Sequence, residues 1–155
     1  MAVPTHMNGR GADGAPDDRA VLAVALGLEH EAVAAYQAAV KSGLLKGDGL
    51  EMATSFLRDH ERHRDTLAAF LRRLGVPPER ARTDYAFGTL TSVADILGLA
   101  ERLEQGALDA YLGNAGALTR SDVLDAAAGI LADETRHVTA LRLARAEAVT
   151  VRPKY

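Results

Sequence analysis

The chain has 155 residues, enough for one domain with a sizeable buried core and short for two. Hydrophobic residues make up 48% of the chain and aromatic residues 5%, and tryptophan is absent, which favours closely packed helices over a β-sandwich. A formal net charge of -3 gives no electrostatic reason to expect nucleic acid or an anionic membrane as a partner. Because cysteine is absent, disulfides and thiolate catalysis are excluded, and any bound metal must use nitrogen and oxygen ligands.

The start of the chain differs in composition from the rest. Residues 1–16 are rich in glycine, proline and small polar side chains, which bury too little apolar surface to offset the entropy of ordering them. We therefore predict a flexible N-terminal tail over 1–16, a helical domain over 17–149 and a short C-terminal tail over 150–155. No stretch is apolar and uncharged for the length of a bilayer crossing, and no basic start leads into an apolar run. We expect a cytoplasmic protein without a membrane partner.

Apolar residues spaced three or four apart predict amphipathic helices. The first predicted helix runs from an acidic cap at Asp17 or Asp18 to Gly43. Three more run over about residues 49–74, 91–118 and 121–148. The longest connection, from residue 75 to about residue 90, begins with Gly-Val-Pro-Pro and lacks a sustained period. It is expected to cross from one end of the domain to the other. The predicted fold class is all-α, a four-helix bundle with a long crossover between its second and third helices.

An internal repeat relates the two halves of the chain. The segment LEHEAVAAY at 28–36 aligns without gaps with LEQGALDAY at 103–111, and DHERHRDTL at 59–67 aligns with DETRHVTAL at 133–141. The offsets are 75 and 74 residues, so two helix pairs repeat in the same order. The repeat predicts two similar helix pairs related by a pseudo-twofold axis.

Each half places acidic and imidazole side chains inside an apolar helical stripe. If the helix pairs pack about the pseudo-twofold axis, these side chains converge in the bundle interior: Glu29, His60, His63, Glu104, Glu134 and His137. A buried carboxylate without a partner costs several kcal/mol or loses its charge. One or two divalent metal ions are the simplest partner for three carboxylates and three imidazoles.

The spacing of these residues supports shared ligation. Glu134 and His137 are three residues apart and share a helix face, as do His60 and His63. The pattern resembles the ferritin-like superfamily of di-iron carboxylate proteins, which includes bacterioferritins and rubrerythrins. In that family one helix of each pair carries a Glu followed seven residues later by a Tyr, and the other carries Asp-Glu-x-x-His. The matching segments are Glu29 to Tyr36, Glu104 to Tyr111 and Asp133-Glu134-Thr135-Arg136-His137.

The resemblance implies a fold and a chemistry. It covers nearly all of residues 18–148 and implies a ferritin-like four-helix bundle with a metal centre, most simply iron, with manganese or zinc as alternatives. It also implies oxygen or peroxide as reaction partners, because two-metal sites of this family act in ferroxidase, peroxidase and oxygenase reactions. The sequence does not choose among these reactions.

The resemblance further assigns roles to the aspartates beside the ligands. Asp59 and Asp133 each precede the first ligand position of their helix. The resemblance implies that Asp59 accepts a hydrogen bond from His137 and that Asp133 accepts one from His63. Such contacts set the tautomer of a ligand imidazole and raise its basicity.

Other polar residues have simpler interpretations. Tyr36 and Tyr111 lie two turns from their glutamates, where they can hydrogen-bond to ligands, act as redox neighbours or contribute to the core. The basic residues of the second helix, including Arg58, Arg62 and Arg64, are interpreted as a solvated outer face.

One position departs from the family pattern. The second helix reads Asp59-His60-Glu61-Arg62-His63, so His60 stands where the family has a metal-bridging Glu. A neutral imidazole has one free lone pair and does not bridge two metals as a carboxylate does. Glu61 is about 100° away around the helix and replaces that bridge only if the helix is distorted. Three alternatives remain: two unequal metal ions bridged by Glu134 alone, a single metal, or a metal-free hydrogen-bonded core.

Two functional hypotheses follow. The first is a metal-binding ferritin-like protein with a di-iron or iron/manganese centre of the oxidase or peroxidase type. The second is a non-catalytic bundle whose polar core holds a structural zinc, a single metal or a vestigial site, acting as an oligomeric binding or stress-related module. A homodimer is the default assembly for a bundle of this size.

Overall fold

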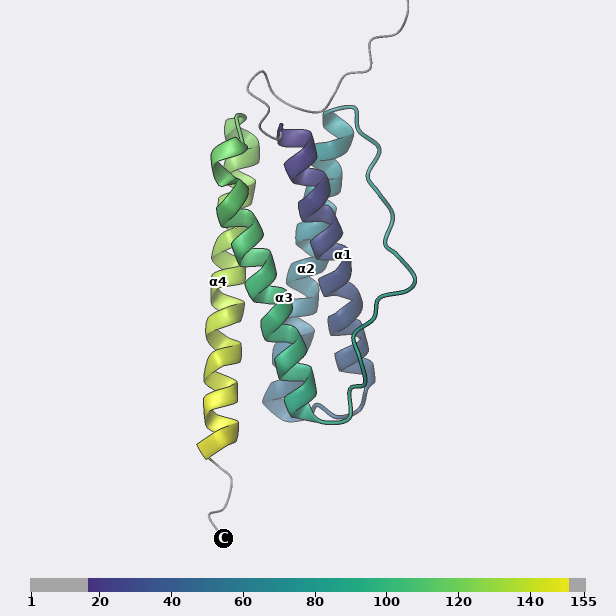
Figure 1. Cartoon of the computed structure of the whole chain (residues 1–155), viewed down its shortest axis with the longest axis vertical. Coiled ribbons are helices and arrows are strands. Elements are labelled where there is room, and N and C mark those ends of the chain that lie inside the picture. Colours follow the sequence, from purple (N-terminus) through teal and green to yellow (C-terminus); the bar gives the residue numbers. More distant parts are fainter. Residues whose placement is uncertain (1–16, 151–155) are drawn as a thin grey trace, which may run out of the picture.

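A computed structural model describes residues 17–150 (Figure 1). Within this range the elements are four α-helices and one short 3-10 helix, without strands, so the all-α prediction is confirmed. The flexible tail predicted over 1–16 lies outside the described residues, as does the C-terminal tail predicted over 150–155 apart from Thr150. None of the described helices combines the length and hydropathy that a bilayer crossing requires.

The first helix pair begins and ends at recognisable local signals. Helix α1 spans Asp18–Lys41 and α2 spans Gly47–Arg73. The Asp17 side chain caps α1 by accepting a hydrogen bond from the backbone N–H of Ala20 at 3.0 Å. Helix α2 ends where Gly75 adopts a φ of 76°, a left-handed conformation that glycine adopts without steric cost.

The second pair follows the same principles. Helix α3 spans Val93–Asn114 and starts with a capping box between Ser92 and Asp95. The sequence pattern extended this helix to about residue 118, but the α-helix ends at Asn114 and a 3-10 helix, Ala115–Ala117, follows. Glycine and asparagine are weak helix formers, which accounts for the earlier end. Helix α4 spans Ser121–Thr150.

Helix contacts define the bundle. Contacts are most extensive within the pairs α1–α2 and α3–α4, then between α1 and α3, and they are sparser between α2 and α4. The connection from α2 to α3 runs outside α1 from one end of the bundle to the other (Figure 1), as the sequence predicted. The ring of His30, on α1, contacts this connection through Nε2, which lies 3.0 Å from the backbone oxygen of Glu79.

Two apolar clusters occupy opposite ends of the bundle interior. One is built around Leu26, Leu67 and Ile130, and the other around Phe56 and Leu141. On every α-helix the buried glutamates and histidines fall between residues of these two clusters in the sequence. The middle of the core is therefore polar.

Candidate metal centre

All six predicted ligand residues come together in the middle of the bundle. Each is at most 3% exposed, and every α-helix contributes at least one. The six residues are Glu29 from α1, His60 and His63 from α2, Glu104 from α3, and Glu134 and His137 from α4. The predicted convergence is thus present in the structure.

These side chains form two overlapping groups with the composition of a metal site. The first group contains Glu29, His60, His63 and Glu134, and the second contains His60, Glu104, Glu134 and His137. In each group one potential ligand atom per residue lies within 4.8 Å of all the others. His60 and Glu134 are common to both groups, where they occupy equivalent positions of the internal repeat.

His60 joins the two halves of the centre. Its Nδ1 donates a hydrogen bond to Glu29 Oε2 at 2.8 Å, and its Nε2 lies 3.1 Å from Glu104 Oε1. Burial disfavours a charged imidazole, but hydrogen bonds and charge from Glu104 and Glu29 outweigh burial and raise the pKa of His60 to about 11. His60 is therefore an imidazolium at neutral pH, with an N–H directed at each carboxylate.

Glu134 and His63 have ligand atoms that the protein does not satisfy. Both oxygens of Glu134 and Nδ1 of His63 are buried without a hydrogen-bond partner among the described residues. His63 Nδ1 is 3.3 Å from Glu134 Oε1, close enough for attraction but without hydrogen-bond geometry. Two ligand atoms at about 2.1 Å from a shared tetrahedral ion lie roughly 3.4 Å apart. This pair is therefore disposed as two ligands of one metal are.

Burial and neighbouring ionisable groups shift the pKa values of Glu134 and His63. Burial is the largest cause that raises the pKa of Glu134 to about 8, and repulsion from Glu104 adds to it. Burial opposes protonation of His63, but the surrounding carboxylates, first Glu134 and then Glu29, raise its pKa to about 10. A bound cation would relieve the repulsion between the carboxylates.

The other two carboxylates are ionised despite burial. Burial opposes ionisation of Glu29, but contacts with His60 and His63 outweigh it and lower its pKa. Burial likewise opposes ionisation of Glu104, and hydrogen bonds from His137 and His60 reverse this and lower its pKa. The centre therefore holds two negative carboxylates beside its imidazole rings.

Both expected histidine–aspartate contacts are present. His63 Nε2 lies 3.1 Å from Asp133 Oδ2, and His137 Nε2 lies 3.2 Å from Asp59 Oδ2. Each ring therefore turns its Nδ1 toward the centre, and Nδ1 of His137 is 3.2 Å from Glu104 Oε2. This arrangement orients each imidazole for ligation through Nδ1.

A ring of ion pairs surrounds the two aspartates that contact His63 and His137. Arg62 contacts Asp59 at 2.8 Å and Asp133 at 2.9 Å, and Arg136 contacts the same aspartates at 2.7 and 3.0 Å. The interpretation of Arg62 as part of a solvated outer face is thus incomplete, because the side chain is 58% exposed yet joins α2 to α4. The sequence signal for this ring was the spacing in both repeats, where an Arg follows the Asp by three residues.

The two tyrosines connect opposite helix pairs. Tyr36 of α1 donates a hydrogen bond to Glu104 of α3, and Tyr111 of α3 donates one to Glu29 of α1 at 3.1 Å. Burial, followed by the charge of the neighbouring glutamate, raises the pKa of both phenols. Both therefore remain protonated donors that orient a carboxylate.

The residues present fit a divalent metal ion. Carboxylate oxygens and imidazole nitrogens are ligands for iron, manganese and zinc, and all protein ligands here are of these two types. Glu61, next to His60 in the sequence, belongs to neither group. The helix is regular at this point, so the possibility that a distortion replaces His60 by Glu61 is not realised.

Comparison with known proteins agrees with this architecture. The sequence model of the ferritin-like domain family matches residues 17–147. A conserved hypothetical protein, rv2844, from Mycobacterium tuberculosis has a similar structure, with 25% identity and a TM-score of 0.75 over 82% of this chain and 96% of that one. A ferritin-like, diiron-carboxylate protein from Bacillus anthracis str. Ames shares the fold at 19% identity, with a TM-score of 0.66 over 81% of this chain and 92% of that one. No curated protein matches significantly. The chain belongs to the ferritin-like domain family.

Proposed function

We propose that this chain binds one or two divalent metal ions at the buried centre. The observation that carries the proposal is the set of buried ligand atoms on Glu134 and His63 that have no hydrogen-bond partner among the described residues. Buried polar atoms are almost always satisfied in proteins, so three orphaned atoms in one place need a ligand. A cation satisfies all three together.

We propose iron or manganese as the functional metal, and a redox reaction with oxygen or peroxide as the activity. The mixed set of carboxylate and imidazole ligands suits either ion. When bound, such a metal supplies electrons to, or accepts them from, an oxygen species. The structural neighbour from Bacillus anthracis is a diiron-carboxylate protein, which supports iron as the metal.

The protein's own residues hold and orient the ligands in this proposal. Glu29, Glu104, Glu134, His63 and His137 bind the metal, and His60 joins them when it has lost its proton. Asp59 and Asp133 hold the Nε2 protons of His137 and His63, so each ring presents Nδ1 to the metal.

A second candidate function is favoured by His60. With an N–H directed at both Glu29 and Glu104, His60 compensates two carboxylates without any metal. This leaves a smaller set, Glu134, His63 and His137, for a single structural ion such as zinc. In this alternative the bundle is a non-catalytic, oligomeric binding or stress-related module.

Metal analysis separates the two candidates. The protein is purified without chelator, its metals are quantified by mass spectrometry, and oxygen uptake is followed after ferrous iron is added anaerobically and air is then admitted. The redox proposal expects iron or manganese in the purified protein and oxygen uptake that exceeds the uptake by free iron. One zinc per chain, with no such excess, would support the structural alternative.

A further inference from the structure

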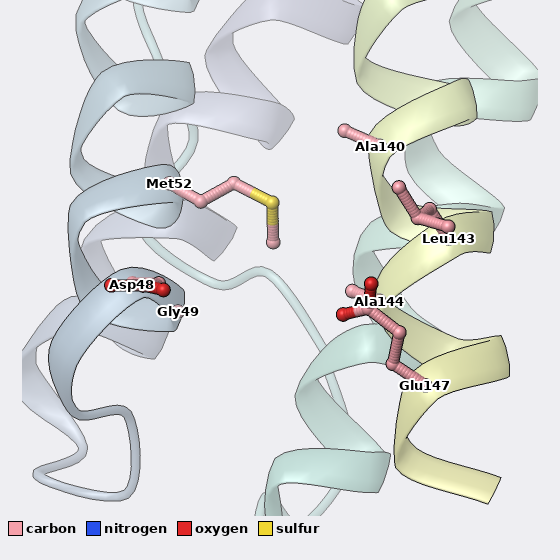
Figure 2. A pocket seen from close by; sticks show the side chains of 7 residues that line it. All are labelled: Asp48, Gly49, Met52, Ala140, Leu143, Ala144 and Glu147. Atoms are coloured by element: carbon pink, nitrogen blue, oxygen red, sulfur yellow. The ribbon is translucent and has the colours of Figure 1, made fainter. Parts of the chain in front are cut away.

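A groove opens between α2 and α4 near one end of the bundle (Figure 2). Its volume is about 520 Å³, within the range of small-molecule sites. Asp48, Gly49 and Met52 line it from α2, and Figure 2 shows the Met52 side chain extending toward α4.

A partly open chamber of about 160 Å³ adjoins this groove. All its lining residues except Tyr36 are apolar, and they include Leu45, Ile96, Leu97 and Leu141. A water molecule needs several polar partners to be stable in a cavity, and an apolar cavity of about 150 Å³ stays dry and binds benzene. The chamber therefore has the size and lining of a site for a small apolar molecule.

The groove and the chamber are neighbours. Gly49, Met52 and Ala144 line both spaces, so these three residues lie at the boundary where a passage between them would run. The absence of a side chain at Gly49 keeps the passage open, and Met52 has a flexible thioether side chain that adapts to different shapes. A small molecule that moved from the groove to the chamber would pass these three residues.

The inner wall of the chamber contacts the metal centre. Tyr36 lines the chamber, its ring stacks on that of His60 with centroids 5.3 Å apart, and its hydroxyl donates a hydrogen bond to Glu104. One aromatic ring therefore separates the chamber from the buried ligand cluster. A molecule in the chamber touches a residue that orients a ligand carboxylate.

We propose that the groove and chamber form a binding site for a small, uncharged apolar organic molecule, held against Tyr36 beside the metal centre. Asp48 and Glu147 line the groove, which disfavours an anionic ligand. The binding site stands without any metal, whereas its use as the substrate site of a redox reaction rests on the proposed function.

Benzene is the probe, and the methyl group of Met52 is the reporter. The chain has three methionines, and Met52 is the one among residues 17–150, so carbon-13 methyl labelling gives a simple NMR spectrum. Benzene is titrated into the full chain as purified and again after chelation. The expected result is a saturable shift of the Met52 signal with a Kd of about 1 mM or lower in both samples.

Two substitutions close the site, and a third serves as the matched control. Gly49→Leu places a side chain in the passage, where an added Cβ meets only Leu45 at 4.0 Å, and Ala144→Leu narrows the passage from α4. Each is expected to weaken benzene binding at least about tenfold. Gly129→Leu, at a helical glycine with nothing within 4 Å, should leave the Kd unchanged.

Three results would overturn the proposal: a shift that does not saturate, a Kd unaffected by both passage variants, or a groove closed by a second copy. Closure by a second copy is recognised in two ways. Sedimentation detects a dimer that Leu143→Lys dissociates, and this dimer does not bind benzene. None of these results depends on metal, so failure of this proposal is distinguishable from failure of the proposed metal centre.

Discussion

His60 and Glu134 hold equivalent positions in the two helix pairs and meet at the centre of the bundle, with His60 Nδ1 3.7 Å from Glu134 Oε1. The neighbouring positions of the two repeats carry identical residues, because Glu29 corresponds to Glu104 and His63 corresponds to His137. The centre is thus symmetrical except at the pair that both groups share. We propose that this exchange of a carboxylate for an imidazole sets how many metal ions the centre binds.

Replacing His60 tests that conclusion directly. His60→Glu removes the imidazolium and adds a carboxylate able to bridge two ions. We expect bound iron or manganese to rise to two ions per chain, measured by mass spectrometry after anaerobic loading and desalting. The control is His60→Gln, which removes the imidazolium without adding a bridge and should not reach two ions. Equal metal content in both variants would show that position 60 does not limit the number of ions.

Glu134 belongs to both groups of ligands, and its removal should be the most damaging single change. For Glu134→Ala we expect metal affinity to fall by more than about 100-fold, since both groups lose a ligand. The matched control is Glu61→Ala, an acid on α2 that belongs to neither group. Competition with a fluorescent chelator measures both affinities. Loss of binding in Glu61→Ala would place the centre on another face of α2.

Metal binding should strengthen as the pH rises. The folded-state pKa values of His60 and His63 are raised to about 11 and about 10, so both rings carry an extra proton at neutral pH. A ligand imidazole must lose that proton, and each proton released raises the binding constant about tenfold per pH unit below the folded pKa. Calorimetry between pH 6 and 9, in buffers of different ionisation enthalpy, counts the released protons. A pH-independent affinity would contradict ligation by these histidines.

The aspartate contacts should affect metal affinity without touching the metal. Asp59→Asn keeps the shape but weakens the hydrogen bond from His137 Nε2 and the ion pairs to Arg62 and Arg136. We expect metal affinity to fall about 10–100-fold. Asp65→Asn, at an exposed acid on the same helix, is the control and should bind as the unmodified chain does. An equal loss in both variants would indicate a general effect of charge.

Much of the fold follows from local sequence signals. Apolar periodicity and caps located the helices to within a few residues, as at Asp17 and Gly75, because both signals act over one or two turns. The repeat also predicted the convergence of the polar residues, since symmetry relates positions that are far apart in the sequence. Local signals were weakest at helix ends, and α3 ends at Asn114 where continued periodicity predicted a longer helix.

Other features depend on three-dimensional relationships that spacing does not encode. The hydrogen bonds from Tyr36 to Glu104 and from Tyr111 to Glu29 cross between helix pairs, and their pairing depends on the vertical register of α1 against α3. The second contact of Arg62, to Asp133, likewise requires α2 and α4 to be aligned. The chamber depends on how all four α-helices pack together, which no single helix reveals.

Anomalous scattering from a crystal of the metal-loaded protein tests the central claim most directly, because it locates, counts and identifies bound ions in one measurement. Data are collected on both sides of the iron and manganese absorption edges. The proposed centre predicts a peak within about 2.0–2.3 Å of Glu134 and of His63 or His137. Ordered Glu134, His63 and His137 side chains without an anomalous peak beside Glu134 would contradict a metal centre at this site.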